Sequence, residues 1–121
     1  MAALARLYGH CVRYWTLAEA TDALPDVRVK VERIRELLTA RPTANGQGAR
    51  LDAEIARLVG ELQNDGIVVR DPERGLIDFP ALAPSGETYL LCWLDGEDAI
   101  EWWHWPDAGF AGRTPIASPP D

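Results

Sequence analysis

The segment from Trp93 to Arg113 concentrates the side chains of this sequence that are best suited to chemistry. It contains four of the five tryptophans, one of the two histidines and a high density of carboxylates. Large aromatic rings beside acids can form a cage for a cationic ligand, although the same rings can simply pack a sheet against helices or a partner. Together with one acid from an earlier strand, this segment supplies the candidate ligand-binding residues, which are Asp78, Trp93, Glu97, Trp103, His104, Asp107 and Arg113.

Three of these residues are candidates for a metal site or for acid–base chemistry. His104 can serve as a ligand or a general base, because its imidazole titrates near neutral pH, and Asp78 and Glu97 could join it around a divalent metal ion. The plainer interpretation is structural. Asp78 lies within an apolar strand, where a carboxylate needs a partner, and Arg70 or Arg113 could form that ion pair.

Two further features carry weaker chemical signals. The turn from Gly109 to Arg113 could hold an anionic group through backbone amides and the guanidinium, although chain reversal also explains its glycines. Cys92 is flanked by apolar residues and is interpreted as a small buried hydrophobe, because the sequence offers no base that would activate its thiol. Nucleotide-binding, zinc-protease, hydrolase and EF-hand motifs are all missing from the sequence.

Two helices must lie upstream of this segment. The first is predicted at about residues 17–40, beginning with a capping box between Thr16 and Glu19. Pro25 lies inside it and predicts a kink or a handover between two helices. The second helix is predicted at about 49–65 and ends at Gly66. Their apolar positions follow heptad spacing, and these are Leu17, Ala20, Leu24, Val27, Val31, Ile34 and Leu38, then Leu51, Ile55, Leu58 and Leu62.

The region of about residues 67–104 reads as strands separated by short turns. The predicted fold class is therefore α+β, with an antiparallel helical hairpin packed on a small antiparallel β-meander of about four strands. Residues 14–114 form the single domain. Residues 1–13 form an N-terminal arm with a weak helical pattern, and the proline-rich tail at 115–121 is expected to be disordered.

The last predicted strand, Ala99 to His104, places tryptophan on both faces of the sheet. Alternation puts Trp102 and His104 on one face, and Trp103 and Trp105 on the other. A two-layer fold covers only one of these faces, so the second set of rings needs another cover. We expect this to be a subunit partner, a ligand pocket or the N-terminal arm.

Charge narrows the range of partners. Nineteen acids against twelve bases give a formal net charge of -7, which argues against nucleic acids and anionic membranes, since both are bound through clustered bases. The sequence lacks a signal peptide pattern and an apolar run long enough to span a membrane. The two cysteines do not suggest a disulfide framework, and a cytoplasmic location is the default expectation.

Several motifs together resemble the prokaryotic domain-of-unknown-function family 2203 (DUF2203). The resemblance covers about residues 14–115 and rests on the segments Tyr14–Ala20 with Leu24–Pro25, Gly66–Asp71, Gly75–Pro80, Leu91–Trp93 with Gly96–Glu97, and Trp103–His104 with Gly109–Arg113. It implies no agreed activity. It marks as characteristic Asp78, Phe79, Cys92, Trp93, Glu97, His104, Gly109 and Arg113, which favours a genuine binding site formed by the sheet and the closing loop. Leu94 and residues 1–13 depart from the family's usual pattern.

Two functional hypotheses follow. The first is a small cytosolic binding or assembly protein that forms a homodimer, or joins a complex, through the helical hairpin and the tryptophan-rich sheet. The alternative is a metal- or ligand-dependent enzyme with a site around Asp78, Glu97, His104 and Arg113, a divalent metal ion as its cofactor and a small-molecule ligand. The sequence does not decide whether the protein is an enzyme.

Overall fold

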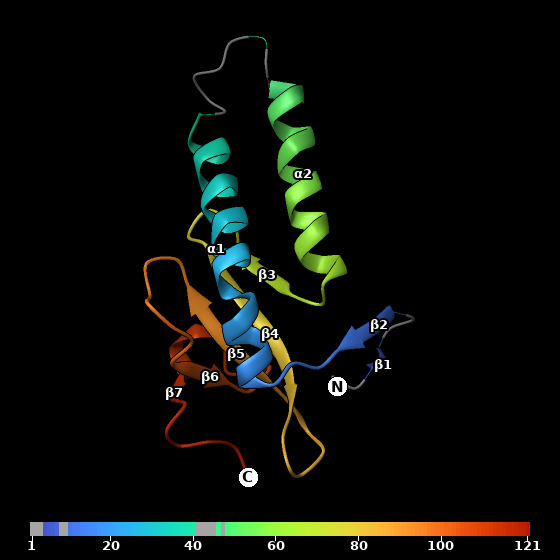
Figure 1. Cartoon of the computed structure of the whole chain (residues 1–121), viewed down its shortest axis with the longest axis vertical. Coiled ribbons are helices and arrows are strands. Elements are labelled where there is room, and N and C mark those ends of the chain that lie inside the picture. Colours follow the sequence, from blue (N-terminus) through green and yellow to red (C-terminus); the bar gives the residue numbers. More distant parts are fainter. Residues whose placement is uncertain (1–3, 8–9, 41–45, 47) are drawn as a thin grey trace.

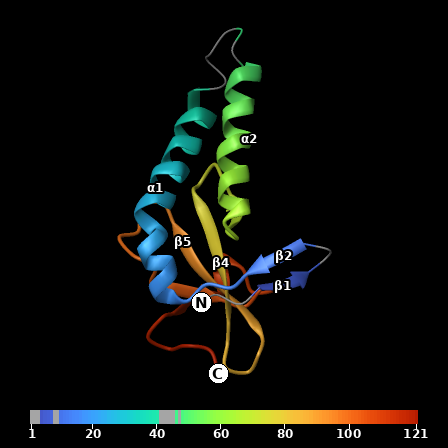
Figure 2. The same cartoon turned by 45° about the vertical axis from the view of Figure 1, so that its right-hand side comes forward.

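A helical hairpin standing on one face of a five-stranded sheet forms the body of the protein (Figure 1). The computed structural model describes residues 4–7, 10–40, 46 and 48–121. Helix α1 (Leu17–Ala40) and helix α2 (Gly48–Asn64) run antiparallel, and part of the hairpin extends beyond the sheet (Figures 1 and 2). None of the described helices is long and apolar enough to span a membrane.

The predicted helix boundaries agree closely with the structure. The capping box forms as expected, because the amide of Thr16 donates to Glu19 Oε1 at 2.9 Å and the amide of Glu19 donates to Thr16 Oγ1 at 3.1 Å. Helix α1 continues through Pro25 without a break in its assignment, so there is no handover between two helices. Helix α2 ends at Asn64 and is capped at Gly66, which has a φ of 85°, with the amide of Ile67 donating to the carbonyl of Leu62.

The main sheet is an antiparallel meander in the order β3-β4-β5-β6-β7. Its strands are β3 (Val68–Asp71), β4 (Leu76–Leu82), β5 (Thr88–Leu94), β6 (Trp102–His104) and β7 (Thr114–Pro115). The expectation of about four strands is one short, because the chain returns after residues 105–113 to form β7, which pairs with β6. Strand β6 is also shorter than the predicted Ala99–His104.

Both ends of the chain differ from their predicted structures. The N-terminal arm forms a separate two-stranded hairpin, β1 (Leu4–Leu7) with β2 (His10–Arg13), rather than helical turns. Its hairpin lies beside the body of the protein (Figure 1). The tail, expected to be disordered, is hydrogen-bonded to the sheet: the amide of Ile116 donates to the carbonyl of Glu101, and the indole of Trp103 donates to the carbonyl of Ser118.

The core lies between the helices and one face of the sheet. Helix α1 contributes the larger share of the buried helical positions, and the heptad spacing of both helices is used for packing within this chain. On the sheet, alternate residues point into this core. They include Ile77, Phe79 and Ala81 of β4, Leu91 and Trp93 of β5, and Trp103 of β6.

The second face of the sheet is also buried, although neither α1 nor α2 covers it. Leu76, Asp78, Leu90, Cys92 and His104 all lie on this face and all are buried. The closing segment, defined here as residues 105–113, turns from the helix face at Trp105 to this side of the sheet at Phe110 and Arg113. The guanidinium of Arg113, the last residue of this segment, stacks on the ring of Trp102 and donates to the carbonyl of Cys92. The sheet is therefore the middle of three layers.

Gly75 in the β3–β4 turn lies in close contact with α1 and with the turn that follows β5. Gly75 has a φ of 74°, and a Cβ there would lie 2.6 Å from the Cβ of Asp95 and 3.0 Å from side-chain carbons of Val31 and Arg35. We expect Gly75→Ala to lower the free energy of unfolding by about 2–5 kcal/mol, through backbone strain and overpacking together. Gly86 has a φ of 92° and open space around it, so Gly86→Ala should cost only about 1–2 kcal/mol. Urea unfolding measures both variants, and equal losses would contradict the predicted close contact.

Candidate functional site

Three potential metal ligands meet on the second face of the sheet. Asp78 lies on β4 directly opposite Cys92 on β5, and His104 on β6 pairs with Leu90, two residues before Cys92. Residues at these register positions point to the same side of a sheet. A carboxylate oxygen, the thiol sulfur and an imidazole nitrogen all lie within 4.8 Å of one another, and all three residues are buried.

The orientation of the His104 ring follows from its two hydrogen bonds. Nδ1 lies 2.7 Å from the carbonyl oxygen of Trp105. Because a carbonyl oxygen only accepts, Nδ1 must carry a hydrogen. Nε2 lies 3.0 Å from Oδ1 of Asp78, and this contact needs one proton between the two atoms. The Asp78–His104 pair therefore shares a proton inside the sheet.

The second oxygen of Asp78 is held from the side. Its Oδ2 accepts a hydrogen bond from Nε of Arg70, which agrees with the ion pair predicted as the structural interpretation. Arg70 sits where the register shifts between Val69 and Asp71, and this β-bulge leaves it without a partner residue on β4. Its side chain remains 40% exposed, so Arg70 links the fully buried carboxylate to solvent.

Cys92 lies beside this pair and is not activated. Burial raises the pKa of the Cys92 thiol to about 12, with a smaller contribution from the nearby Asp78 carboxylate. The thiol is thus protonated at neutral pH and is a poor nucleophile. A transition metal can still displace a thiol proton, because the thiolate is the form that binds the ion.

Glu97 and Arg113 form a separate pair at the edge of the same face. Arg113 grips the carboxylate with two hydrogen bonds of 2.7 and 2.8 Å and also donates to the carbonyl of Cys92. The amide of Leu94 donates to Glu97 as well. Burial alone would raise the pKa of Glu97, but the hydrogen bonds from Arg113 and Leu94 outweigh it and hold that pKa below its ordinary value. Arg113 is thus engaged by a carboxylate, which leaves its predicted role as an anion holder without support.

The structure brings together only part of the predicted site. Asp78 and His104 meet, whereas the third member of their cluster within the described chain is Cys92 rather than Glu97. Trp93 and Trp103 belong to the core on the opposite face, and Asp107 is exposed in the closing segment. The proposed aromatic cage of acids and tryptophans therefore does not form as a single pocket.

The tryptophans on both faces of β6, which were expected to need a partner or ligand as cover, are contacted by other residues of this chain. On the second face, the guanidinium of Arg113 lies 5.3 Å from the ring of Trp102 and 4.7 Å from that of Phe110. On the helix face, Trp105 packs edge-on against Trp103 at 5.2 Å. These rings no longer argue for a subunit partner, and homodimer formation stays a prediction.

Cys92 was missed as a member of the site because the sequence does not give strand register. The alternation of each strand is visible from its residues, but only the β4–β5 pairing places Asp78 opposite Cys92. A signal was nevertheless present, since an acid, a cysteine and a histidine each interrupt an otherwise apolar or aromatic strand.

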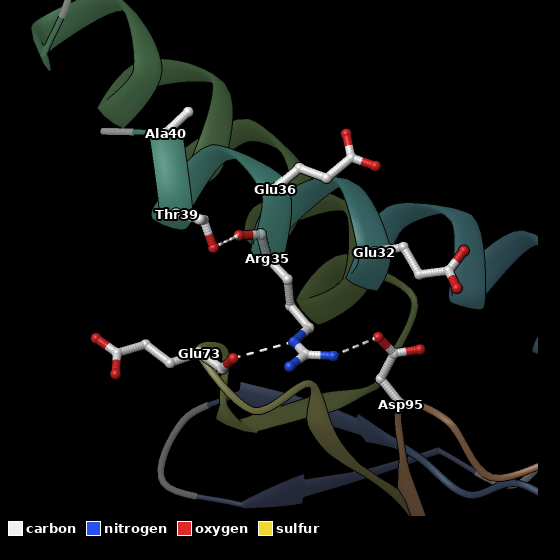
Figure 3. Close-up of a pocket in the computed structure, with 7 residues that line it drawn as sticks. All are labelled: Glu32, Arg35, Glu36, Thr39, Ala40, Glu73 and Asp95. Atoms are coloured by element: carbon white, nitrogen blue, oxygen red, sulfur yellow. Dashed lines mark hydrogen bonds and ion pairs between the residues drawn. The ribbon is translucent and has the colours of Figure 1, made fainter. Parts of the chain in front are cut away.

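Apart from the Asp78–Cys92–His104 cluster, the structure has an open hollow beside the C-terminal half of α1, and most of its charged lining residues are acidic (Figure 3). It has a volume of about 850 Å³ and is lined by Glu32, Arg35, Glu36, Thr39, Ala40, Glu73 and Asp95. Arg35 crosses its floor, donating to Asp95 Oδ2 at 2.7 Å and to the carbonyl of Glu73 at 3.0 Å. These contacts join α1 to two turns of the sheet, so the centre of the hollow has a structural role.

The Glu97–Arg113 pair predicts a pH-dependent contribution to stability. Because the folded-state pKa of Glu97 is lowered, its contribution is present above about pH 4.5 and is lost as the pH falls through the folded-state value. We expect Glu97→Gln to lower the free energy of unfolding by about 1–3 kcal/mol at pH 7, with the deficit shrinking below pH 4.5. Denaturant unfolding between pH 2 and 7 measures this, with the exposed Glu87→Gln as control. A deficit that does not change with pH would contradict the role of the charge.

Comparison with known proteins gives one family. A family model described as an uncharacterized conserved protein (DUF2203) matches residues 41–116, which include all five strands of the main sheet and the closing segment. The match begins after α1, so the motif at Tyr14–Pro25 lies outside it. No curated protein and no solved structure gives a significant match. The chain belongs to the DUF2203 family of uncharacterized conserved proteins.

Proposed function

We propose that this protein binds a transition-metal ion of the zinc type through Asp78, Cys92 and His104. The observation that carries the proposal is the convergence of a carboxylate, a thiol and an imidazole within 4.8 Å on three neighbouring strands. Zinc favours nitrogen and sulfur ligands, with carboxylate oxygen also used. The proposal develops the metal-dependent alternative and replaces Glu97 with Cys92 in the ligand set.

The surroundings of the cluster support this proposal. Histidines that bind a metal through one nitrogen usually donate the other N–H to a carbonyl or carboxylate, and ligating carboxylates are themselves held by hydrogen bonds. His104 donates Nδ1–H to the carbonyl of Trp105 and turns Nε2 toward the other two residues. Arg70 holds Oδ2 of Asp78 and leaves Oδ1 on the side of the cluster.

Charge balance also favours a divalent ion. A Cys92 thiolate and an Asp78 carboxylate supply two negative charges to the ion, and the charge of Arg70, which is also paired with Asp78, lies on a side chain that is 40% exposed to solvent. The ion would take the place of the proton now shared between Asp78 and His104, so the ligands would need only small shifts. Rigid neighbouring strands make such a site more precise than one on loops. Three protein ligands leave a fourth position, which a reacting water occupies in catalytic zinc sites.

The experiment is metal loading of the full chain, read by two independent methods. Protein purified without a tag should contain about one zinc per chain by plasma mass spectrometry. Cobalt(II) exchanged into it should show thiolate-to-cobalt charge-transfer absorption. Cys92→Ser should remove that absorption, and both Cys92→Ser and His104→Gln should weaken zinc binding by more than the roughly 10–100-fold that loss of a hydrogen-bonding partner of a ligand costs.

The control variant is Glu97→Gln, which removes a nearby carboxylate outside the cluster and should load normally. Circular dichroism establishes that each variant is folded before its metal content is compared. Metal-free protein that takes up neither zinc nor cobalt would overturn the proposal. Asp78, His104 and Arg70 would then be a buried ion-pair network with a structural role only.

Zinc affinity should fall as the solution is acidified. Metal binding must release the proton of the Cys92 thiol, whose pKa of about 12 means that this proton is held throughout the neutral range. Asp78 and Arg113 act on the thiol electrostatically, and Asp78 is itself hydrogen-bonded to His104 and Arg70. The apparent dissociation constant should rise about tenfold per proton released for each unit of pH decrease. Competition with a chromogenic chelator between pH 6 and 8 measures this, and a pH-independent affinity would contradict thiolate ligation.

A further inference from the structure

The C-terminal segment Ile116–Asp121 occupies one end of the core on the opposite side of the sheet from the proposed metal site. It is anchored by the amide of Ile116 on the carbonyl of Glu101, and by the indole Nε1 of Trp103, which donates to the carbonyl of Ser118 at 2.9 Å. Pro120 is buried. The anchoring carbonyl thus comes immediately before the Pro119–Pro120 pair.

The surface under this segment is aromatic and apolar. It is formed by the start of α1, by β5 and by β6, and with the segment itself it lines a hollow of about 240 Å³ made of Leu17, Tyr89, Leu91, Trp103, Ile116, Pro119 and Pro120. We call this surface the Tyr89–Trp103 groove. Among its lining residues, the Tyr89 and Trp103 rings meet edge-on at 5.6 Å.

These features match the physical requirements for recognising a proline-rich peptide. Such peptides carry prolines without amide donors, adopt a restricted extended backbone and dock on aromatic grooves. An indole N–H at the groove is well placed to donate to a peptide carbonyl. In this chain, the donor is Trp103 and the acceptor is the carbonyl that precedes two prolines.

The chain's own segment fills the groove only in part. A hollow of about 240 Å³ remains beside Pro119 and Pro120, and Leu17 at its edge is 37% exposed. A proline-containing segment that also covered Leu17 would bury this apolar surface more fully than residues 116–121 do.

We propose that the Tyr89–Trp103 groove is a docking site for a proline-rich segment of a partner protein, and that residues 116–121 occupy it as an intramolecular competitor. Binding exchanges one proline-containing segment for another at the same indole donor. Because the competitor is tethered close to the groove, its effective concentration is on the order of millimolar. A partner must therefore displace it, which makes docking weak until the competitor is released.

The test uses the full chain and a fluorescein-labelled twelve-residue peptide that contains the sequence Ala-Ser-Pro-Pro-Asp. Pro119→Ser combined with Pro120→Ser weakens the internal competitor and leaves the groove intact. Fluorescence anisotropy should show that the double variant binds the peptide about tenfold more tightly than the original chain. The indole N–H signal of Trp103 should shift on binding in a ¹H–¹⁵N correlation spectrum.

Two controls make the result specific. A peptide with both prolines replaced by alanine should not bind, and adding Tyr89→Ala to the double variant should abolish binding while circular dichroism stays native. Equal affinity for the original chain and the double variant would overturn the competition, and binding to neither would overturn the docking site. Neither result bears on zinc loading, so this proposal and the metal proposal succeed or fail separately.

Discussion

The charge on Asp78 is the constraint on which much of this structure depends. Its side chain is inaccessible to solvent, and a buried carboxylate is tolerated only when each oxygen has a partner. One oxygen is bonded to His104 and the other to Arg70. Meeting both needs fixes the pairing of β4 with its neighbours and places the bulge of β3 at Arg70. It also requires β6 to end where the carbonyl of Trp105 can hold the far side of the imidazole. Three strands and the start of the closing segment are thus positioned around a single charge.

Three arginines connect the sheet to the helix layer on one side and to the closing segment on the other. Arg28 of α1 donates to the carbonyls of Glu97 and Asp98, and Arg35 of the same helix joins the β3–β4 turn to Asp95. Arg113 closes the opposite face through Glu97. The turn at residues 95–98 is therefore held from the helix layer and from the closing segment together. A guanidinium suits this role because its donors spread over several acceptors in a fixed plane.

The features that could be predicted from the sequence are those encoded locally. The capping box at Thr16, the glycine cap at Gly66 and the apolar spacing of both helices each depend on residues a few positions apart, so their interpretation needed no knowledge of the fold. Of the two partners predicted for Asp78, Arg70 forms the ion pair and Arg113 does not, and the Arg70 pairing could be predicted because a short turn joins the two strands. The inclusion of Cys92 and the exclusion of Glu97 depended on which strands neighbour each other and in what register. Strand β7 was missed because two residues carry too little pattern, and its pairing with β6 is set by the closing segment.

Burial of the Cys92 thiol has a consequence for how this protein meets oxidants and alkylating reagents. With a pKa of about 12, roughly one thiol in 10⁵ is ionised at pH 7, and peroxide and iodoacetamide react with the ionised form. In this structure the Cys92 thiol is therefore unreactive toward these reagents. Measurable labelling requires local opening of the structure that exposes the buried thiol. The labelling rate of Cys92 therefore measures how often the structure opens locally around this residue.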